Sequence, residues 1–390
     1  MAEYRRPRKK ITTELPSDIL FFNVLLRLPA KSILRFRYVS KQWHSILTSP
    51  EFLNMHLHHV TNDDRQNHHK LLVLSRTTPC NFHTIDCESP EDGVSVSRPL
   101  PFEVSPKNMS VITSFNGLVC VGITKRSSDD KYSDLMLWNP LTGDYKRLHR
   151  SNSCEECYEV TPRASALYYT SYDDDFKLLR VTHNYDAYIY SLKSDSWRKL
   201  GTTEDLKRRR YLISESWVSS TVLNEKVYFL KRGKRRNIGR QSYSVIRFDT
   251  KTEKFTKIST PSLGVGRKAC LTFTLLIKDR KIHLCVIYYS FGRANSIDLR
   301  AKFCRMDGDR DWTKVVTYQM PKCLFFDVPL HLMRNDNWFT YSVCHGFHVY
   351  NLDIVRHLNE ISYSNMVYGR EITPRAKYIE TLVSPNRWMK

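Results

Sequence analysis

The sequence predicts an α+β fold in two domains, a small all-α domain near the N-terminus and a larger all-β domain after it. Residues 13–58 place helix-capping residues before apolar residues that recur at three- and four-residue spacing, as in short amphipathic helices. Residues 59–70 are mostly polar and form a predicted linker. From 71 to 388, short apolar runs are separated by Gly, Asn, Asp and Pro, the pattern of strands and turns. Residues 1–12 are a basic tail.

Length and composition support a folded, strand-rich protein. The chain has 390 residues, so about 320 remain for the body after the helical domain and its tail. Hydrophobic residues make up 41% and aromatic residues 12% of the chain, with 22 Tyr and 18 Phe. This balance favours a substantial β-rich core over a disordered chain.

The strongest bulk feature is a formal net charge of +21, with basic runs at 5–10, 207–210 and 231–236. A positive field of this size attracts anionic surfaces but specifies no partner. The first run fits a nuclear-import signal, a phosphate-binding arm or a solvated tail. The other two flank strand-like segments, and we expect both on solvated loops.

The cysteines and the N-terminus indicate a reducing environment. Ten cysteines are scattered along the chain, and no apolar signal core follows the basic N-terminus. We therefore expect reduced thiols and a location in the nucleus, the cytoplasm or both. No stretch approaches 18 uninterrupted apolar residues, so no membrane partner is predicted.

The helical domain contains several start and stop signals. Pro16, followed by Ser17 and Asp18, suits the first turn of a helix, and Pro29 ends that helix. Ser32 and Ser40 are predicted N-caps of two short helices. The run 49–51 (Ser-Pro-Glu) repeats the start signal for a last helix.

Part of the apolar content of this domain should face a partner or the next domain. Phe36, Val39, Trp43 and Ile46 recur along one predicted apolar face. A unit of about 45 residues is too small to bury all such side chains by itself.

The runs 15–18 (Leu-Pro-Ser-Asp) and 27–43, followed by Ser49-Pro50 and Phe52, resemble the plant F-box consensus. The resemblance implies that the helices pack on a Skp-family adaptor, which bridges to cullin and RING subunits. It implies adaptor contacts at eight residues: Leu15, Pro16, Ile19, Leu28, Pro29, Leu34, Val39 and Trp43. For Val39 and Trp43, the alternative is a place in the internal core of the helical domain.

One departure from the family pattern affects the first helix. The stretch between Asp18 and Arg27 is one residue longer than in the usual F-box. An extra residue rotates a helix by about 100°. Either the start of the helix absorbs this change, or Phe21 and Phe22 face the adaptor in an unusual register.

The β domain contains a diffuse internal repeat, at 138–148, 190–200 and 248–258. Each copy has an aromatic residue at its first and eighth positions, a polar middle, and a basic residue before a final Leu or Ile. A looser copy ends at 311–315. This pattern predicts a strand, a polar turn and a returning strand, repeated as the blades of a propeller. Further strands are predicted between the copies, at 117–122, 177–181, 226–230, 281–289 and 338–343.

Three segments of the β domain resemble the F-box-associated domain of plant proteins, which is kelch-like and all-β. They are 114–120 (SFNGLVC), 137–143 (LWNPLTG) and 378–385 (YIETLVSP). A standard kelch propeller is disfavoured, because the chain has only 13 glycines and no Gly-Gly pair. The resemblance implies that this domain binds the protein to be ubiquitinated, through residues that the sequence leaves unknown. The Trp and Tyr residues of the repeats are interpreted as blade packing.

Signals for catalysis or metal binding are weak. Cys154 and Cys157 form a lone pair without a second ligand pair at zinc-finger spacing. Five histidines, interpreted as a solvated cluster, lie at the end of the last helix and in the linker: His56, His58, His59, His68 and His69. The chain has no Gly-rich phosphate loop and no common hydrolase motif. We therefore expect no catalytic residue, metal or cofactor.

The two resemblances together imply a non-catalytic substrate receptor of a Skp-cullin-F-box (SCF) ubiquitin ligase, which would bind a Skp-family adaptor and an unidentified protein target. The competing hypotheses are a basic nucleic-acid-binding protein, which lacks a reading motif, and an F-box scaffold acting outside a ligase.

Overall fold

The computed structural model divides the chain into two compact units, residues 1–67 and 68–390. Described are residues 24–62, 69–75, 80–93, 98–104, 108–124, 133–149, 158, 163–202, 216–234, 241–261, 269–291, 297–308, 311–320, 328–335, 337–342, 346–350, 355–357 and 372–387. Leu15, Pro16 and Ile19, the lengthened stretch with Phe21 and Phe22, and Cys154 and Cys157 lie outside these ranges.

The first unit is helical. It contains the 3-10 helix η2 (Leu25–Arg27) and the helices α1 (Ala30–Phe36), α2 (Lys41–Leu47) and α3 (Pro50–Asn62). No described helix of the chain is long and apolar enough to cross a membrane.

Serine side chains cap two of these helices as predicted. Ser40 accepts a hydrogen bond from the backbone of Trp43 (3.1 Å), and Ser49 accepts one from Phe52 (3.2 Å). The prediction for Ser32 is wrong, because α1 already begins at Ala30 and Ser32 lies inside it. The carbonyl of Pro29 accepts the first helical bond, from Ser32 N (2.8 Å), so the fixed φ of proline starts this helix without a side-chain cap.

The core of the helical unit is small and well buried. It contains Leu25, Leu26, Ala30, Ile33, Leu47, Phe52, His56, Leu57 and Val60. The predicted apolar face does not belong to it: Val39 is 62% exposed, while Phe36, Trp43 and Ile46 are only half-buried. The short helices thus leave apolar side chains accessible, as the size of the unit suggested.

The second unit consists of antiparallel four-stranded sheets. Its strands are β1 (His69–Ser75), β2 (Asn81–Asp86), β3 (Arg98–Pro99), β4 (Met109–Phe115), β5 (Leu118–Thr124), β6 (Ser133–Trp138), β7 (Tyr145–Arg147), β8 (Ala164–Thr170), β9 (Asp175–Val181), β10 (Asp186–Ser191), β11 (Ser196–Thr202), β12 (Ser216–Leu223), β13 (Lys226–Lys234), β14 (Gln241–Asp249), β15 (Lys254–Ile258), β16 (Ala269–Lys278), β17 (Lys281–Phe291), β18 (Ile297–Asp307), β19 (Asp311–Met320), β20 (Val328–Leu332), β21 (Trp338–Ser342), β22 (Gly346–Tyr350), β23 (Val355–His357) and β24 (Ile372–Ile379). A 3-10 helix, η3 (Pro90–Asp92), follows β2.

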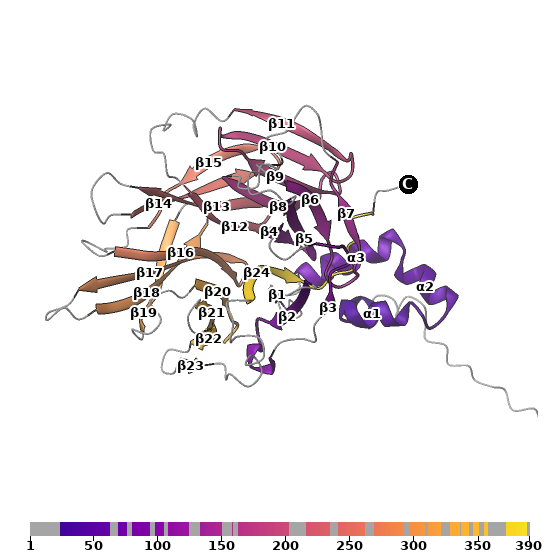
Figure 1. The fold of residues 1–390 in the computed structure, drawn as a ribbon, viewed down its shortest axis with the longest axis horizontal. Helices are drawn as coiled ribbons and strands as arrows, with labels where there is room; N and C mark the ends of the chain where they lie inside the picture. Colours follow the sequence, from indigo (N-terminus) through magenta and orange to yellow (C-terminus); the bar gives the residue numbers. More distant parts are fainter. Residues whose placement is uncertain are drawn as a thin grey trace, which may run out of the picture. The chain divides into compact units, whose positions relative to one another are not determined.

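The described strands form six sheets, which we number as blades 1 to 6. Blades 2 to 6 each take four consecutive strands, beginning with β4, β8, β12, β16 and β20. Blade 1 has the order β24-β1-β2-β3, so the last strand of the chain pairs with the first. Figure 1 shows this closure, with β24 in yellow beside β1. The predicted β-propeller is therefore confirmed, and the described residues form six blades.

The first strands of the blades face one another around the centre of the propeller. β4 contacts β24 and β8, β12 contacts β8 and β16, and β16 contacts β20. At the closure, Lys377 Nζ of β24 lies 3.3 Å from His331 Nδ1 of β20. β-Bulges interrupt the pairing of the innermost strand in every blade except the one that starts with β8.

Apolar clusters fill the spaces between neighbouring blades. Trp138, which begins the first repeat copy, packs edge-on against Phe82 of blade 1, with ring centroids 4.8 Å apart. Phe248, which begins the third copy, packs against Tyr168 of blade 3. Tyr190, which begins the second copy, is fully buried. Trp138 therefore packs between blades, as interpreted from the sequence, and Phe248 does the same. Tyr190 instead packs against Trp197 of its own blade, with ring centroids 5.2 Å apart.

Several boundaries differ from the expected ones. α3 runs beyond residue 58 to Asn62, and β1 begins at His69, inside the expected linker. The basic run 231–236 was expected on a loop, but its residues 231–234 extend strand β13. The backbone pairing of β13 with β14 continues to Lys234, so this pairing keeps the basic residues in a strand although their side chains are polar.

Candidate functional site

The most exposed apolar surface of the helical unit lies at the corner between α1 and α2. Tyr38 is 89% exposed and Val39 is 62% exposed. The amides of these two residues bond to the carbonyls of Arg35 (3.2 Å) and Phe36 (3.1 Å), so the corner has a defined backbone. Arg37 fixes it further, because its Nη2 donates to the carbonyl of Leu47 (3.3 Å). We call Pro29, Leu34, Tyr38, Val39 and Trp43 the helical surface set.

The structure leaves each described residue of the predicted adaptor site at least partly accessible. Pro29 and Val39 are exposed, and Leu28, Leu34 and Trp43 are half-buried. Trp43 also packs edge-on against Phe36, with ring centroids 5.6 Å apart. Of the two interpretations of Val39, the structure excludes a place in the core, whereas Trp43 both packs internally and faces solvent. Their contact with an adaptor stays a prediction.

Sequence reasoning missed Tyr38. The sequence feature that could have identified it is its place beside Val39, between two short helices. A residue in such a corner lies on neither helix, so neither helix buries it.

His56 corrects the interpretation of the histidine group as solvated. It is buried in α3, stacks on Phe52 and lies 2.9 Å through Nε2 from the carbonyl of Leu28. Burial lowers the pKa of His56 despite this hydrogen bond. His69 lies in β1 and stacks on His331, so it belongs to the propeller.

In the propeller, the three segments that carried the second resemblance meet at one joint. The side chain of Asn139, after β6, donates to the carbonyls of Thr381 (2.9 Å) and Val383 (2.7 Å). The hydroxyl of Thr381 donates to the carbonyl of Asn116, in the β4–β5 turn (3.0 Å). The segment that follows β24 therefore crosses the turns of blade 2.

Gly117 makes this close approach possible. Its φ is +90°, and a Cβ atom there would lie 1.9 Å from Thr381 Oγ1. Only glycine therefore fits this position, for both its backbone conformation and its contact.

The same segment continues to blade 3. Asn386 donates to the carbonyl of Tyr145 (3.2 Å), and Arg387 Nη2 forms an ion pair with Asp174 Oδ2 (3.1 Å). Tyr169 donates to the other oxygen of Asp174 (2.7 Å). Residues 380–387 thus join blades 1, 2 and 3.

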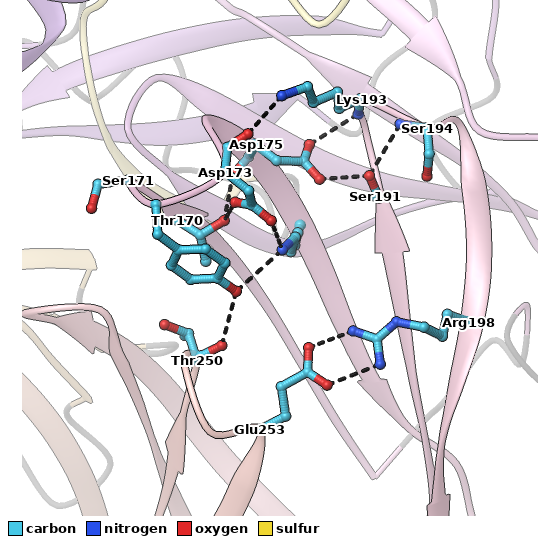
Figure 2. Close-up of polar contacts among 12 residues, drawn as sticks. Thr170, Ser171, Asp173, Asp175, Ser191, Lys193, Ser194, Arg198, Thr250 and Glu253 are labelled. Carbon is cyan, nitrogen blue, oxygen red and sulfur yellow. Dashed lines mark hydrogen bonds and ion pairs between the residues drawn. The ribbon is translucent and has the colours of Figure 1, made fainter.

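A polar network joins blade 3 to blade 4 (Figure 2). Asp173 pairs with Lys177 and accepts a hydrogen bond from Thr170. Lys177 also bonds to the hydroxyl of Tyr172, which donates to the carbonyl of Thr250 (3.2 Å). Tyr172 is 52% exposed. A tyrosine held at its hydroxyl is a preorganised aromatic contact surface.

Two further interactions of Figure 2 complete this network. Arg198 of β11 and Glu253 of blade 4 form a two-bond ion pair. Buried Asp175 accepts from Ser191 Oγ (2.5 Å) and Lys193 N (2.9 Å). Burial raises the pKa of Asp175 although these donors act in the opposite direction.

A third polar group lies where blade 6 meets blade 1. His331 Nε2 is 2.8 Å from Glu88 Oε1, and His331 Nδ1 faces the ammonium of Lys377. An ammonium can only donate, so Nδ1 accepts and Nε2 carries the proton that bonds to Glu88. Burial and the charge of Lys377 lower the pKa of His331 to about 4. The imidazole is thus a neutral bridge between a cation and an anion.

These polar groups connect blades, and the described residues contain no cluster of three His, Cys, Asp or Glu side chains that could hold a metal ion.

Comparison with known families identifies the domain family of each unit. Residues 71–369 match the F-box associated beta propeller domain, and residues 13–55 match the F-box domain. The chain belongs to the F-box associated beta propeller family. Both resemblances noted in the sequence are confirmed.

Similar proteins from Arabidopsis thaliana are also F-box proteins. F-box protein CPR1 is 25% identical over 79% of this chain and 74% of its own length. The F-box/LRR-repeat/kelch-repeat protein At2g27520 is 25% identical over 65% of this chain and 62% of its own length. An alpha-L-arabinanase of Penicillium chrysogenum in complex with arabinobiose matches 72% of this chain and 82% of its own at 9% identity, with a TM-score of 0.39, too low to support an argument.

For this F-box associated propeller, the family segments have a structural explanation. Segments 114–120, 137–143 and 378–385 supply Asn116 and Gly117, Asn139, and Thr381 and Val383 to the joint. These contacts close the propeller.

Proposed function

We propose that this chain is the substrate-recognition subunit of an SCF ubiquitin ligase. Its F-box binds a Skp-family adaptor, and its propeller binds a protein whose ubiquitination the assembled ligase promotes. The pairing of an F-box with an F-box associated propeller supports a substrate-adaptor role.

The observation that carries the proposal is the exposed corner at Tyr38 and Val39. Ile33, Leu47 and Phe52 are completely buried and supply the core of the F-box, so the corner is not needed for internal packing. Exposed apolar residues beside half-buried Leu34 and Trp43 form the kind of surface that a protein partner covers. Of the implied contacts, the helical surface set contains Pro29, Leu34, Val39 and Trp43, and it adds Tyr38.

A receptor of this kind needs no catalytic group. It raises the local concentration of the target beside a conjugating enzyme held elsewhere in the complex. We therefore propose that the chain is not an enzyme, that it uses no cofactor, and that the contribution of the propeller is binding alone.

The test is co-elution of the full chain with a purified Skp-family adaptor. Val39→Asp places a charge on the exposed corner and should abolish co-elution without unfolding the F-box. His58→Asp is the matched control, because it adds the same charge to an exposed position of α3 and should leave binding intact.

Two results would contradict the proposal. Failure of the wild-type chain to bind the adaptor would do so. If deletion of Phe21, which restores the usual F-box length, then rescued binding, the lengthened first helix would be the cause, and the chain would be an F-box scaffold acting outside a ligase. Salt-sensitive retention on DNA or RNA without adaptor binding would instead favour the nucleic-acid hypothesis.

A further inference from the structure

The internal repeat places a basic residue at an equivalent position in the outer strands of four successive blades. These residues precede the final apolar position of each repeat copy, and they are Arg147 (β7), Lys199 (β11), Lys257 (β15) and Lys314 (β19). All four side chains are exposed.

In blades 2 and 3, an aspartate on the neighbouring strand compensates this charge. Arg147 pairs in register with Met136, and Asp134, two residues before Met136, lies 2.6 Å from Arg147 Nη2. Lys199 pairs in register with Tyr188, and Asp186, again two residues earlier, lies 3.5 Å from Lys199 Nζ. In these two blades the repeat thus contains a basic residue and its acidic partner.

Blades 4 and 5 keep the base and lack the acid. Lys257 pairs in register with Ile246, and the residue two positions earlier is Ser244. Lys314 pairs with Cys304, and the residue two positions earlier is Lys302. Among the residues that the structure describes, neither Lys257 nor Lys314 forms an ion pair.

Two more exposed lysines, Lys251 and Lys254, lie in the same hairpin of blade 4. The two carboxylates of this hairpin, Asp249 and Glu253, are already engaged. Glu253 pairs with Arg198, and Asp249 accepts from the backbone of Thr252 (2.9 Å). We call Lys251, Lys254, Lys257 and Lys314 the lysine band.

The lysine band spans two adjacent blades. The indole of Trp312, in β19, donates to the carbonyl of Ser259, directly after β15 (2.7 Å). This contact holds the outer strands of blades 4 and 5 together. The exposed acid of these strands is Asp311, at the start of β19.

We propose that the lysine band is the docking site for a segment of the target protein rich in Asp and Glu. The purpose of this binding rests on the proposed receptor function. Carboxylates on an extended segment would supply the partners that blades 4 and 5 lack and blades 2 and 3 have. Tyr172 adjoins the band through its bond to Thr250, next to Lys251, and offers an apolar contact to the same segment.

The spread of the band favours carboxylates over a single phosphate group. Lys254 and Lys257 are three residues apart on the edge strand β15, so they are about 10 Å apart and their side chains leave opposite faces of the sheet. Phosphate is typically held by converging donors, often the fork of an arginine, whereas these lysines are separate point charges.

The test uses the full chain and a fluorescently labelled poly-glutamate peptide, with binding measured by anisotropy at low salt. The variant Lys254→Glu/Lys257→Glu/Lys314→Glu should bind the peptide at least about tenfold more weakly. The matched control is Lys31→Glu/Arg35→Glu/Lys41→Glu, which changes the net charge equally at exposed positions of the F-box. This control should lose less than about twofold if the site, and not net charge, binds the peptide.

A second variant restores the missing acid. Ser244→Asp places a carboxylate where Asp186 stands in blade 3, so it should neutralise Lys257 and weaken peptide binding severalfold. Equal losses in both triple variants, or unchanged binding in the lysine-band variant, would overturn the proposal. So would tighter binding of an RNA oligonucleotide of equal charge that depends on the same lysines.

Edge lysines also prevent strands from pairing between molecules. Light scattering and the same peptide assay on Lys254→Gln/Lys257→Gln/Lys314→Gln test this explanation. If Lys254, Lys257 and Lys314 serve only this purpose, their replacement by Gln would produce oligomers with unchanged peptide affinity, which would refute the docking site. Adaptor co-elution, measured in parallel, reports on the proposed receptor function separately.

Discussion

The side-chain amide of Asn139 donates to the main-chain carbonyl of Thr381 and also to that of Val383, two residues further along. Asn139 is completely buried, and its Oδ1 accepts from the backbone of Leu141 (2.8 Å). One side chain therefore shapes the turn after β6 and holds the segment that follows β24, the strand that completes blade 1.

Replacing Asn139 with Leu should lower the free energy of unfolding by roughly 3 kcal/mol or more. The variant leaves two buried carbonyls without donors, and each such group costs about 1 to 3 kcal/mol. Urea denaturation followed by tryptophan fluorescence measures the loss. Asn184→Ala, at an exposed turn position, should change stability by less than about 0.5 kcal/mol. Equal losses in the two variants would show that the joint does not stabilise the propeller.

Gly117→Ala should be more damaging than Gly143→Ala. Both glycines have positive φ, +90° and +80°, so both variants incur backbone strain of about 1 to 2 kcal/mol. A Cβ at Gly143 meets no atom within 4 Å, whereas at Gly117 it collides with Thr381. We expect Gly117→Ala to lose about 2 kcal/mol more, because the chain end must move. Thermal unfolding of both variants measures this difference, and identical shifts would exclude a role for the close approach.

The strands of blades 2 to 5 were predictable because their signals are local. The predicted segment 177–181 lies within β9 and 281–289 within β17, where apolar runs end at turn residues. Closure by β24 was not predictable in the same way. The hydrogen bonds of Asn139 join residues more than 240 positions apart, and no local pattern encodes such a pairing.

The prediction of the adaptor site from sequence was limited by a different cause. Helical spacing grouped Val39 with Phe36 and Trp43, but α1 ends at Phe36 and the chain turns before α2. Spacing along a helix has no meaning across such a corner. For the same reason the exposure of Tyr38, and the burial of His56 against the carbonyl of Leu28, emerged only from the packed helices.

The junction at His331 should make the propeller less stable in mild acid. An unfolded histidine takes up a proton near pH 6.5, whereas folded His331, with its pKa lowered to about 4, does not. Between these values the unfolded state binds more protons, so the free energy of unfolding falls as pH falls, by about 3 kcal/mol in total. Urea denaturation at several pH values measures the slope.

A glutamine at position 331 can accept from Lys377 and donate to Glu88 without titrating. His331→Gln should therefore flatten the dependence of stability on pH between 4 and 6.5. His183→Gln, at an exposed histidine, should leave the dependence unchanged. If His331→Gln keeps the full slope, the acid sensitivity arises from other groups.

The F-box should separate stability from adaptor binding at two residues that are six positions apart. Ile33 is completely buried, so Ile33→Ala should destabilise the helical unit by about 2 to 5 kcal/mol, seen as faster hydrogen exchange across α1 and α3. Val39 is 62% exposed, so Val39→Ala should leave exchange unchanged. Adaptor affinity, measured by calorimetry, should nevertheless fall for Val39→Ala, because a partner that covers the corner loses apolar contact area there. Unchanged affinity together with unchanged exchange would place the adaptor on another face of the F-box.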